Sequence, residues 1–128
     1  MKKILVILPT YNESKNIERL YFLLKKVNLK LSYLFIDHGS IDGTLTIIKS
    51  IKKKFPKNVF LITKKIREGI GKAHKDGLKW SYKKNYDLVI TMDTDLAHHP
   101  KYIKNLIFKS KNFDLVVGSR YLKKKIND

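Results

Sequence analysis

Two carboxylates follow an apolar run in the stretch LVITMDTDLAHHP, residues 88–100. Asp93 and Asp95 are two positions apart, so both side chains can turn toward one point after a strand. Unpaired, the two charges would repel each other, and one carboxyl would stay protonated. A hard cation such as Mg²⁺ or Mn²⁺ relieves this repulsion and keeps water or phosphate oxygens as further ligands. The pattern favours a divalent metal site, with turn acids or helix caps as the alternative.

Two histidines and a proline come directly after these acids. His98 and His99 are alternative metal ligands, but we favour their interpretation as loop residues before a helix. Proline fits the first turn of a helix, so the helix is expected to begin at Pro100.

The charge balance of the chain is unusual. Its 128 residues include 28 basic and 11 acidic side chains, a formal net charge of +17. This balance favours anionic partners such as nucleic acid, lipid headgroups or phosphorylated small molecules. Only Arg19, Arg67 and Arg120 are arginine, and no nucleic-acid module is recognised, so we expect no nucleic-acid partner; compositional bias is the alternative explanation of the lysines. The absence of cysteine excludes disulfides and thiolate metal sites.

Apolar runs alternate with segments of helical period along the chain. The runs are short and rich in Ile, Leu and Val, as in a parallel sheet covered on both faces. The expected strands are Lys3–Leu8, Leu31–Ile36, Val59–Thr63, Leu88–Met92 and Asp114–Val117. The expected helices are Ser14–Val27 with Asn12 or Ser14 as its cap, a second from Thr44 to the stop at Pro56, Gly71–Lys84, and a fourth from Pro100. This alternation predicts one doubly wound α/β domain over residues 1–128.

The few acids are concentrated where ligands bind in such folds. In open α/β sheets, ligands lie at the carboxyl ends of the strands. Acids at or just past these ends are Glu13, Asp37, Asp42, Asp93 and Asp95. A basic chain with its acids on one rim is expected to hold a positive group there. Together with nearby lysines, a divalent ion at this rim suits a diphosphate substrate.

Five motifs, in order, resemble family 2 glycosyltransferases, most of all the dolichol-phosphate (polyprenol-phosphate) mannosyltransferase branch. They are LPTYNESKNI (8–17), IDHGSIDGT (36–44), REGIGKAHKDG (67–77), MDTDLAHHP (92–100) and VVGSRY (116–121). The resemblance covers essentially the whole chain. It implies a Rossmann-like GT-A fold, a mostly parallel sheet with helices on both faces, that uses a nucleoside-diphosphate sugar and Mg²⁺ or Mn²⁺.

The resemblance also implies roles for individual residues. Asp93 and Asp95 match the D-x-D acids that hold the metal and diphosphate, and they are the expected catalytic residues. Gly69 and Gly71 match a loop that passes close to the donor. The implied nucleotide-sugar contacts are Pro9, Tyr11, Glu13, Asp37, Asp93, Thr94, Asp95 and Arg120. A packing role for Tyr11 and a helix-dipole role for Glu13 are the alternatives.

The implied reaction transfers a hexose, most of all mannose, to a polyprenol phosphate with inversion of the anomeric carbon. GDP-mannose is the favoured donor and UDP-glucose the second candidate. Because a lipid phosphate is already ionised, no dedicated general base is needed. The basic surface would be attracted to an anionic membrane face. We expect a cytoplasmic protein, with peripheral attachment to the cytoplasmic face of the membrane as a further expectation.

The chain departs from the family pattern in three places. His38 stands where the second of two adjacent aspartates is usual, which puts the choice of base in doubt because a neutral histidine cannot accept from two base N–H groups. Ala97 replaces a polar residue that often helps the metal. The chain ends soon after GSRY, so we expect a donor-binding half without the acceptor half. The alternative function is a truncated, non-catalytic module that binds a nucleotide sugar or a partner.

Overall fold

The computed structural model describes residues 2–27, 29–96 and 99–113. The fifth strand expected at residues 114–117 lies outside these ranges, and so do Ala97, His98 and Arg120. The predictions made for that strand and for these three residues therefore stay predictions.

Four parallel strands form one sheet in the order β3-β2-β1-β4. The strands are β1 (Ile4–Thr10), β2 (Ser32–His38), β3 (Val59–Lys64) and β4 (Leu88–Thr91). The helices are α1 (Ile17–Lys25), α2 (Thr44–Lys54), α3 (Ile70–Lys83) and α4 (Ile103–Lys109), and a short 3₁₀ turn, η1 (Pro100–Tyr102), precedes α4. The predicted α/β fold is confirmed. The four strands and four helices that were expected within the described ranges are all present.

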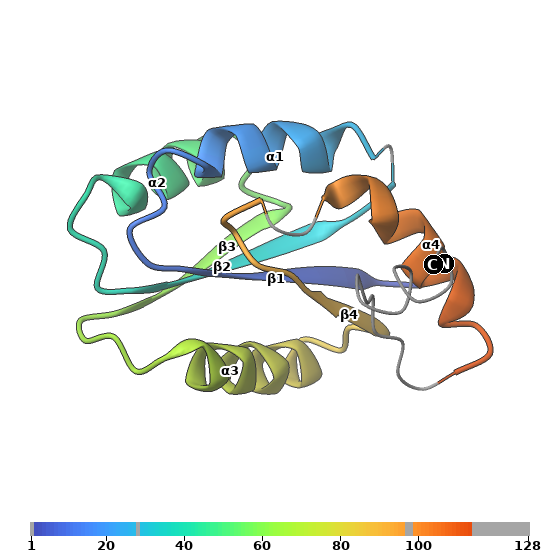
Figure 1. Cartoon of the computed structure of the whole chain (residues 1–128). Coiled ribbons are helices and arrows are strands. Elements are labelled where there is room, and N and C mark those ends of the chain that lie inside the picture. Colours follow the sequence, from blue (N-terminus) through green and yellow to red (C-terminus); the bar gives the residue numbers. More distant parts are fainter. Residues whose placement is uncertain (1, 28, 97–98, 114–128) are drawn as a thin grey trace, which may run out of the picture.

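Helices cover both faces of the sheet. In Figure 1, α1, α2 and α4 lie over one face, and α3 lies over the other. The side chains of β1 alternate accordingly, because successive strand residues point to opposite faces. Val6 and Leu8 belong to the core beneath α1 and α2, whereas Leu5 and Ile7 belong to the core beneath α3. Burial on both faces explains why the strands are continuous apolar runs.

The central strands extend further than the sequence indicates. β1 was expected to end at Leu8 and β2 at Ile36, but β1 continues to Thr10 and β2 to His38. The two strands stay paired as far as Thr10 opposite Asp37, whereas β4 pairs with β1 only up to Ile7. Pro9, which has no N–H to donate, therefore lies beyond the part of β1 that β4 pairs with.

The predicted caps of the first helix are wrong. The helix begins at Ile17, with Asn16 as the N-cap residue and no side-chain cap hydrogen bond. Asn12 and Ser14 instead bond to the loop after β2: the Asn12 Oδ1 accepts from the Ile41 N–H at 2.9 Å, and the Ser14 N–H donates to Asp42 at 3.1 Å. The Asn12 Oδ1, the group that a cap would have used, thus accepts from a longer-range partner, whereas the Ser14 bond uses its backbone.

The strand order creates a switch point beside β1. The connections from β1 to β2 and β3 run to one side of β1, and β4 lies on its other side. Ligands in open α/β sheets bind where the order reverses, outside the carboxyl ends of the strands. That position lies between the loop after β1 and the loop after β4.

α3 packs very closely on the sheet at Gly77. A Cβ atom built at Gly77 would lie 2.8 Å and 2.9 Å from two side-chain carbons of Ile7, whereas one built at Gly71 in the same helix meets nothing within 4 Å. We expect Gly77→Ala to be less stable than Gly71→Ala by about 1–3 kcal/mol, because only the Gly77 variant overpacks the core. Urea unfolding of the two variants measures the difference, and equal midpoints would contradict it.

Candidate functional site

A cleft of about 220 Å³ lies at the carboxyl ends of β1, β2 and β4. It combines acidic, basic and apolar side chains from loops that are far apart in the sequence. Its lining consists of Pro9, Thr10, Tyr11, Glu13, Ile36, His38, Arg67, Gly69, Ile70, Ala73, Asp93, Thr94 and Asp95. The cleft therefore lies at the switch point of the sheet.

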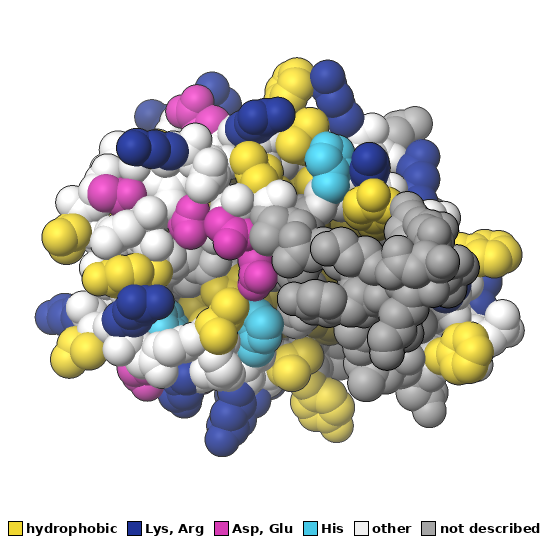
Figure 2. Space-filling model, viewed as in Figure 1, with side chains coloured by type: hydrophobic (Ala, Val, Ile, Leu, Met, Phe, Trp, Pro, Cys, Tyr) yellow, Lys and Arg dark blue, Asp and Glu magenta, His cyan; other side chains and the backbone are white. Residues whose placement is uncertain are grey.

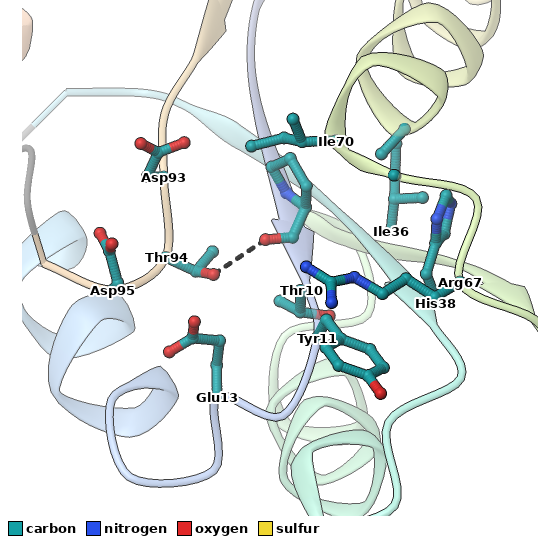
Figure 3. Close-up of a pocket in the computed structure, with 13 residues that line it drawn as sticks. Thr10, Tyr11, Glu13, Ile36, His38, Arg67, Ile70, Asp93, Thr94 and Asp95 are labelled. Carbon is teal, nitrogen blue, oxygen red and sulfur yellow. Dashed lines mark hydrogen bonds between the residues drawn. The ribbon is translucent and has the colours of Figure 1, made fainter.

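One side of the cleft is acidic. Asp93 and Asp95 come from the loop after β4, and Glu13 comes from the loop after β1. In Figure 3 these three side chains lie on the same side of the cleft, away from Arg67 and His38. Figure 2 shows acidic side chains gathered on this face, with lysine and arginine side chains toward the outline of the molecule. In a chain of net charge +17, this is a local concentration of negative charge.

Thr94 fixes the loop that carries the two aspartates. It is only 4 % exposed, and its hydroxyl donates to the carbonyl oxygen of Pro9 at 2.8 Å. Asp93 is half-buried and Asp95 is exposed on either side of it. Thr94 thus ties the end of β1 to the loop after β4, which keeps both carboxylates beside the first loop.

The first loop is fixed from the other side by a buried carboxylate. Asp37, 2 % exposed at the end of β2, accepts from the Thr10 hydroxyl at 2.8 Å. It also accepts from the hydroxyl of Ser40 at 2.6 Å and from its N–H at 3.1 Å. Asp37 is not among the lining residues of the cleft. Its position supports a role in joining β1, β2 and the next loop, and its predicted contact with a nucleotide stays a prediction.

Further bonds join the loop after β1 to the loop after β2. The Asn12 N–H donates to the Ser40 hydroxyl and the Glu13 N–H to the Thr44 hydroxyl, both at 2.8 Å. Asn12 adopts a left-handed backbone conformation with φ of 52°, which asparagine tolerates better than most residues. These contacts hold the backbone of Glu13, and with it the acidic side of the cleft.

The opposite side of the cleft is basic and apolar. The Arg67 guanidinium lies over the ring of Tyr11, with its Cζ 4.3 Å from the ring centroid. The loop that carries Arg67 approaches the end of β2 so closely that a Cβ on Gly39 would lie 2.7 Å from the carbonyl oxygen of Lys65. The Glu68 N–H donates to His38 Nδ1 at 3.3 Å. Close packing and a side-chain bond therefore position Arg67 at the cleft.

The sequence-predicted residues are largely brought together. Pro9, Tyr11, Glu13, Asp93, Thr94 and Asp95 all line the cleft, and so does Gly69, whereas Gly71 is absent from the lining. His99 accepts from the Lys101 N–H at 3.0 Å just before η1, so it is a loop residue that caps a helix, as favoured. The sequence analysis gave no role to Arg67. Its position shortly after an expected strand, as one of few arginines in a lysine-rich chain, could have indicated a place at the ligand-binding rim.

The acidic side could hold a hard metal ion. Asp93 and Asp95 offer carboxylate oxygens, which Mg²⁺ and Mn²⁺ prefer. Within the described residues, no three histidine, aspartate or glutamate side chains form a metal-binding group. The residues present therefore fit an ion that takes two protein carboxylates and completes its coordination with phosphate oxygens and water, rather than a closed site made of protein alone.

Comparison with known proteins places this arrangement in a family. The sequence profile of glycosyl transferase family 2 matches residues 5–128. The chain is 30 % identical over 122 residues to a polyprenol monophosphomannose synthase of Mycolicibacterium smegmatis, covering 94 % of this chain and 46 % of the relative. It is 30 % identical over 118 residues to an undecaprenyl-phosphate mannosyltransferase of Micrococcus luteus, covering 92 % of this chain and 48 % of the relative. The chain thus spans about half the length of these relatives.

Solved structures share the fold. The mannosyltransferase PcManGT from Pyrobaculum calidifontis, in complex with GDP-Man and Mn²⁺, matches with a TM-score of 0.75 and 23 % identity, over 88 % of this chain and 33 % of that one. S. aureus TarS 1-349 in complex with UDP matches with a TM-score of 0.71 and 25 % identity over the same shares of the two chains. The expected GT-A-like fold is confirmed by these likenesses. Among the residues described, no helix has the length and apolar character needed to cross a bilayer.

The buried Asp37 carboxylate generates a stability prediction. In Asp37→Asn one acceptor oxygen becomes an NH₂ group, so either the Ser40 N–H or the two hydroxyls lose their acceptor. We expect a loss of about 1–3 kcal/mol in unfolding free energy, the cost of unsatisfied buried polar groups. The control is Asp87→Asn, where an exposed carboxylate accepts one bond from the Lys3 N–H. If urea unfolding shows equal losses of unfolding free energy in both variants, Asp37 does not have the proposed role of joining β1, β2 and the next loop.

Asp42 generates a prediction about acid sensitivity. Hydrogen bonds, chiefly from the Thr44 hydroxyl, hold the pKa of Asp42 well below its ordinary value of 3.8, although desolvation opposes them. A depressed pKa in the folded state adds stability that is present above pH 4 and is lost as the pH falls further. We expect the parent chain to lose more stability than Asp42→Asn between pH 6 and pH 2. The urea unfolding midpoints of both proteins, measured across this pH range, give the loss of stability. The prediction is contradicted if the midpoints of the two proteins change identically with pH.

Proposed function

Because the chain belongs to glycosyl transferase family 2, we propose that its cleft binds a nucleoside-diphosphate sugar with a divalent ion for transfer of a hexose to a polyprenol phosphate. Mannose is the favoured hexose and GDP-mannose the favoured donor, with UDP-glucose as the second candidate. The observation that carries the proposal is the acidic side of the cleft at the switch point, where Glu13, Asp93 and Asp95 face a basic and apolar side. The two mannosyltransferase relatives support the choice of sugar and acceptor.

The acidic side is the proposed end for the diphosphate. Asp93 and Asp95 would hold a divalent ion, Mg²⁺ or Mn²⁺, and the diphosphate would be held through that ion, since bare phosphate oxygens and carboxylates repel each other. When bound, such an ion neutralises charge that develops on the departing nucleoside diphosphate. Arg120 of the GSRY motif stays a predicted phosphate contact, because it lies outside the described residues.

The proposed transfer needs positioning more than proton removal. The bond between the anomeric carbon and the diphosphate breaks, and its electron pair leaves on the diphosphate. An oxygen of the acceptor phosphate forms the new bond on the opposite face of the sugar, through an oxocarbenium-like state, and the configuration inverts. This acceptor oxygen is already ionised, so the proposal asks no residue of the cleft to act as general base.

The remaining contacts follow from the lining. Pro9 lies near the end of β1 and Tyr11 in the loop after it, and their predicted contacts with the nucleotide are consistent with their place in the cleft. The basic surface of the chain suits both the phosphorylated lipid and an anionic membrane face. A membrane-bound acceptor would thus be attracted to the same protein that binds the donor.

A non-catalytic module is the second candidate function. It is favoured by the cleft itself, whose acidic and apolar sides suit binding of a nucleotide sugar whether or not a transfer follows. Such a module would bind the nucleotide sugar with its metal ion and transfer nothing. Incubating the chain with radiolabelled GDP-mannose, Mn²⁺ and polyprenol phosphate in detergent separates the two functions, since only a transferase moves label into the lipid phase.

The first test is calorimetric titration with GDP-mannose and UDP-glucose, with and without Mn²⁺. We expect saturable binding that requires Mn²⁺ and weakens at least tenfold in Asp95→Asn, because one of the two proposed carboxylate ligands is lost. Asp87→Asn is the control, since Asp87 is an exposed acid just before β4, at the opposite end of that strand from the cleft. If a folded chain binds neither donor, or if Asp95→Asn binds as tightly as the parent, the proposed function is wrong.

A further inference from the structure

The helix that follows the cleft presents a basic and aromatic surface. Between Asp95 and Asp114 the chain has four lysines and no acidic residue. Three aromatic side chains of this stretch are well exposed, at 48 % for Tyr102, 67 % for Phe108 and 66 % for Phe113. The lysines are exposed as well, and they are Lys101, Lys104, Lys109 and Lys111. These seven side chains are called the α4 surface below.

The α4 surface faces away from the core because α4 is amphipathic. Ile103 is only 1 % exposed in the core beneath α1 and α2, and Ile107, one turn later, packs against that core. Lys104 and Phe108 are also one turn apart, on the outer side of the helix, where both are exposed. Figure 1 shows α4 over the same face of the sheet as α1. The inner side thus anchors α4 to the domain, and the outer side is open to solvent.

Cations and rings lie close together on the α4 surface. The Lys101 Nζ lies 5.1 Å from the ring centroid of Tyr102, and the Lys111 Nζ lies 5.4 Å from that of Phe108. Such pairs are weak when they are exposed to water, so they do not explain why the rings are outside. A lysine beside an aromatic ring suits the headgroup region of a bilayer, where the ring enters the acyl boundary and the ammonium stays with the lipid phosphates.

Charge complementarity favours an anionic membrane over other partners. Each lysine near an anionic lipid surface is attracted to it, and the α4 surface has no acid to oppose this attraction. A second copy of the chain would bring a further net charge of +17 to the same place, which disfavours self-association there. Nucleic acid is disfavoured because the α4 surface has no arginine, the usual residue for forked contacts with bases and phosphates.

We propose that the α4 surface docks on an anionic membrane: Phe108 and Phe113 enter the boundary between headgroups and acyl chains, and the lysines bind lipid phosphates. This inference deepens the membrane part of the proposed function and rests on it. Because α4 follows the loop that carries Asp93 and Asp95, docking brings the acidic side of the cleft near the lipid surface. A polyprenol phosphate in that membrane would then meet the donor without leaving the bilayer.

The outer side of α3 is the competing surface, and it supplies matched controls. α3 lies over the opposite face of the sheet from α4 and exposes Tyr82, at 85 %, together with Lys75 and Lys79. It also carries Asp76, which is paired with Lys72 at 3.0 Å and lowers the net positive charge of that helix. Substitutions on α3 can therefore remove one exposed ring, or two lysine charges, just as substitutions on α4 do.

The experiment measures cosedimentation of the chain with vesicles of phosphatidylcholine, alone or mixed with phosphatidylglycerol in equal parts. We expect the parent chain to bind only the anionic vesicles. Phe108→Ser should bind them roughly tenfold more weakly, the lower end of the worth of burying a phenylalanine side chain. The double variant Lys104→Gln/Lys109→Gln should lose roughly 25-fold, about fivefold for each lysine, and this loss should shrink as salt is added.

The control variants on α3 should bind anionic vesicles as the parent chain does. Tyr82→Ser removes an exposed ring, and Lys75→Gln/Lys79→Gln changes the net charge by the same amount as the α4 double variant. Charges on the far face contribute little, because salt screens them over the thickness of the domain. Circular dichroism checks that each variant is folded, and light scattering gives the oligomeric state of the parent chain and of Phe108→Ser.

The outcomes identify what the α4 surface binds. If the folded α4 variants bind vesicles as tightly as the α3 variants, or if only the α3 variants lose binding, the α4 surface is not the docking site. Equal binding of the parent chain to neutral vesicles refutes recognition of anionic lipid. A parent dimer that Phe108→Ser makes monomeric assigns the surface to a second copy. A single-stranded oligonucleotide that binds more tightly than the vesicles, and more weakly to the α4 variants, assigns it to nucleic acid.

Calorimetry with GDP-mannose and Mn²⁺ on the same variants separates this inference from the proposed donor site. We expect the α4 variants to bind the donor as the parent chain does while their vesicle binding falls. If the parent chain binds the donor but no vesicles, docking through the α4 surface is refuted and the donor site stands. If it binds anionic vesicles through the α4 surface but no donor, the docking surface stands and the proposed donor site fails.

Discussion

The buried carboxylate of Asp37 is the constraint on which the arrangement of the cleft depends. A charge removed from water is tolerated only where hydrogen bonds replace its hydration. Thr10 and Ser40 supply those bonds, and they come from the end of β1 and from the loop after β2. Satisfying one buried charge therefore brings the carboxyl ends of the two central strands into a single geometry. The first loop, which carries Tyr11 and Glu13, starts from that fixed point.

Hydrogen bonds spread this constraint into the neighbouring loops. The backbone N–H groups of Asn12, Glu13 and Ser14 all donate to side chains of the loop after β2 or the start of α2. The loop after β3 is joined through the bond from Glu68 to His38. Thr94 joins the loop after β4 to Pro9. Because each loop is tied to β1 or β2, the lining of the cleft is held by the sheet and does not depend on the loops alone.

The elements were predictable from local pattern, and the details of the site were not. Apolar runs and helical periodicity indicated the four strands and four helices of the described ranges. α3 begins and ends one residue earlier than the expected Gly71–Lys84. The acids after β1, β2 and β4 indicated the ligand-binding rim. The extension of β2 through Asp37 and His38 was not predictable, because polar residues read as a strand end unless their partners in other loops are known. The same reason explains the wrong caps at Asn12 and Ser14.

Two strands divide the chemistry of the proposed site between them. The loop after β4 carries the carboxylates proposed for the metal ion and diphosphate, and the end of β2 carries His38 in the apolar part of the lining. The loop that carries Asp93 and Asp95 is held through Thr94, whereas His38 is held through Glu68. Both ends are joined to β1, the strand that they share, because Thr10 donates to Asp37 and Pro9 accepts from Thr94. A disturbance at the carboxyl end of β1 is therefore transmitted to both sides of the cleft.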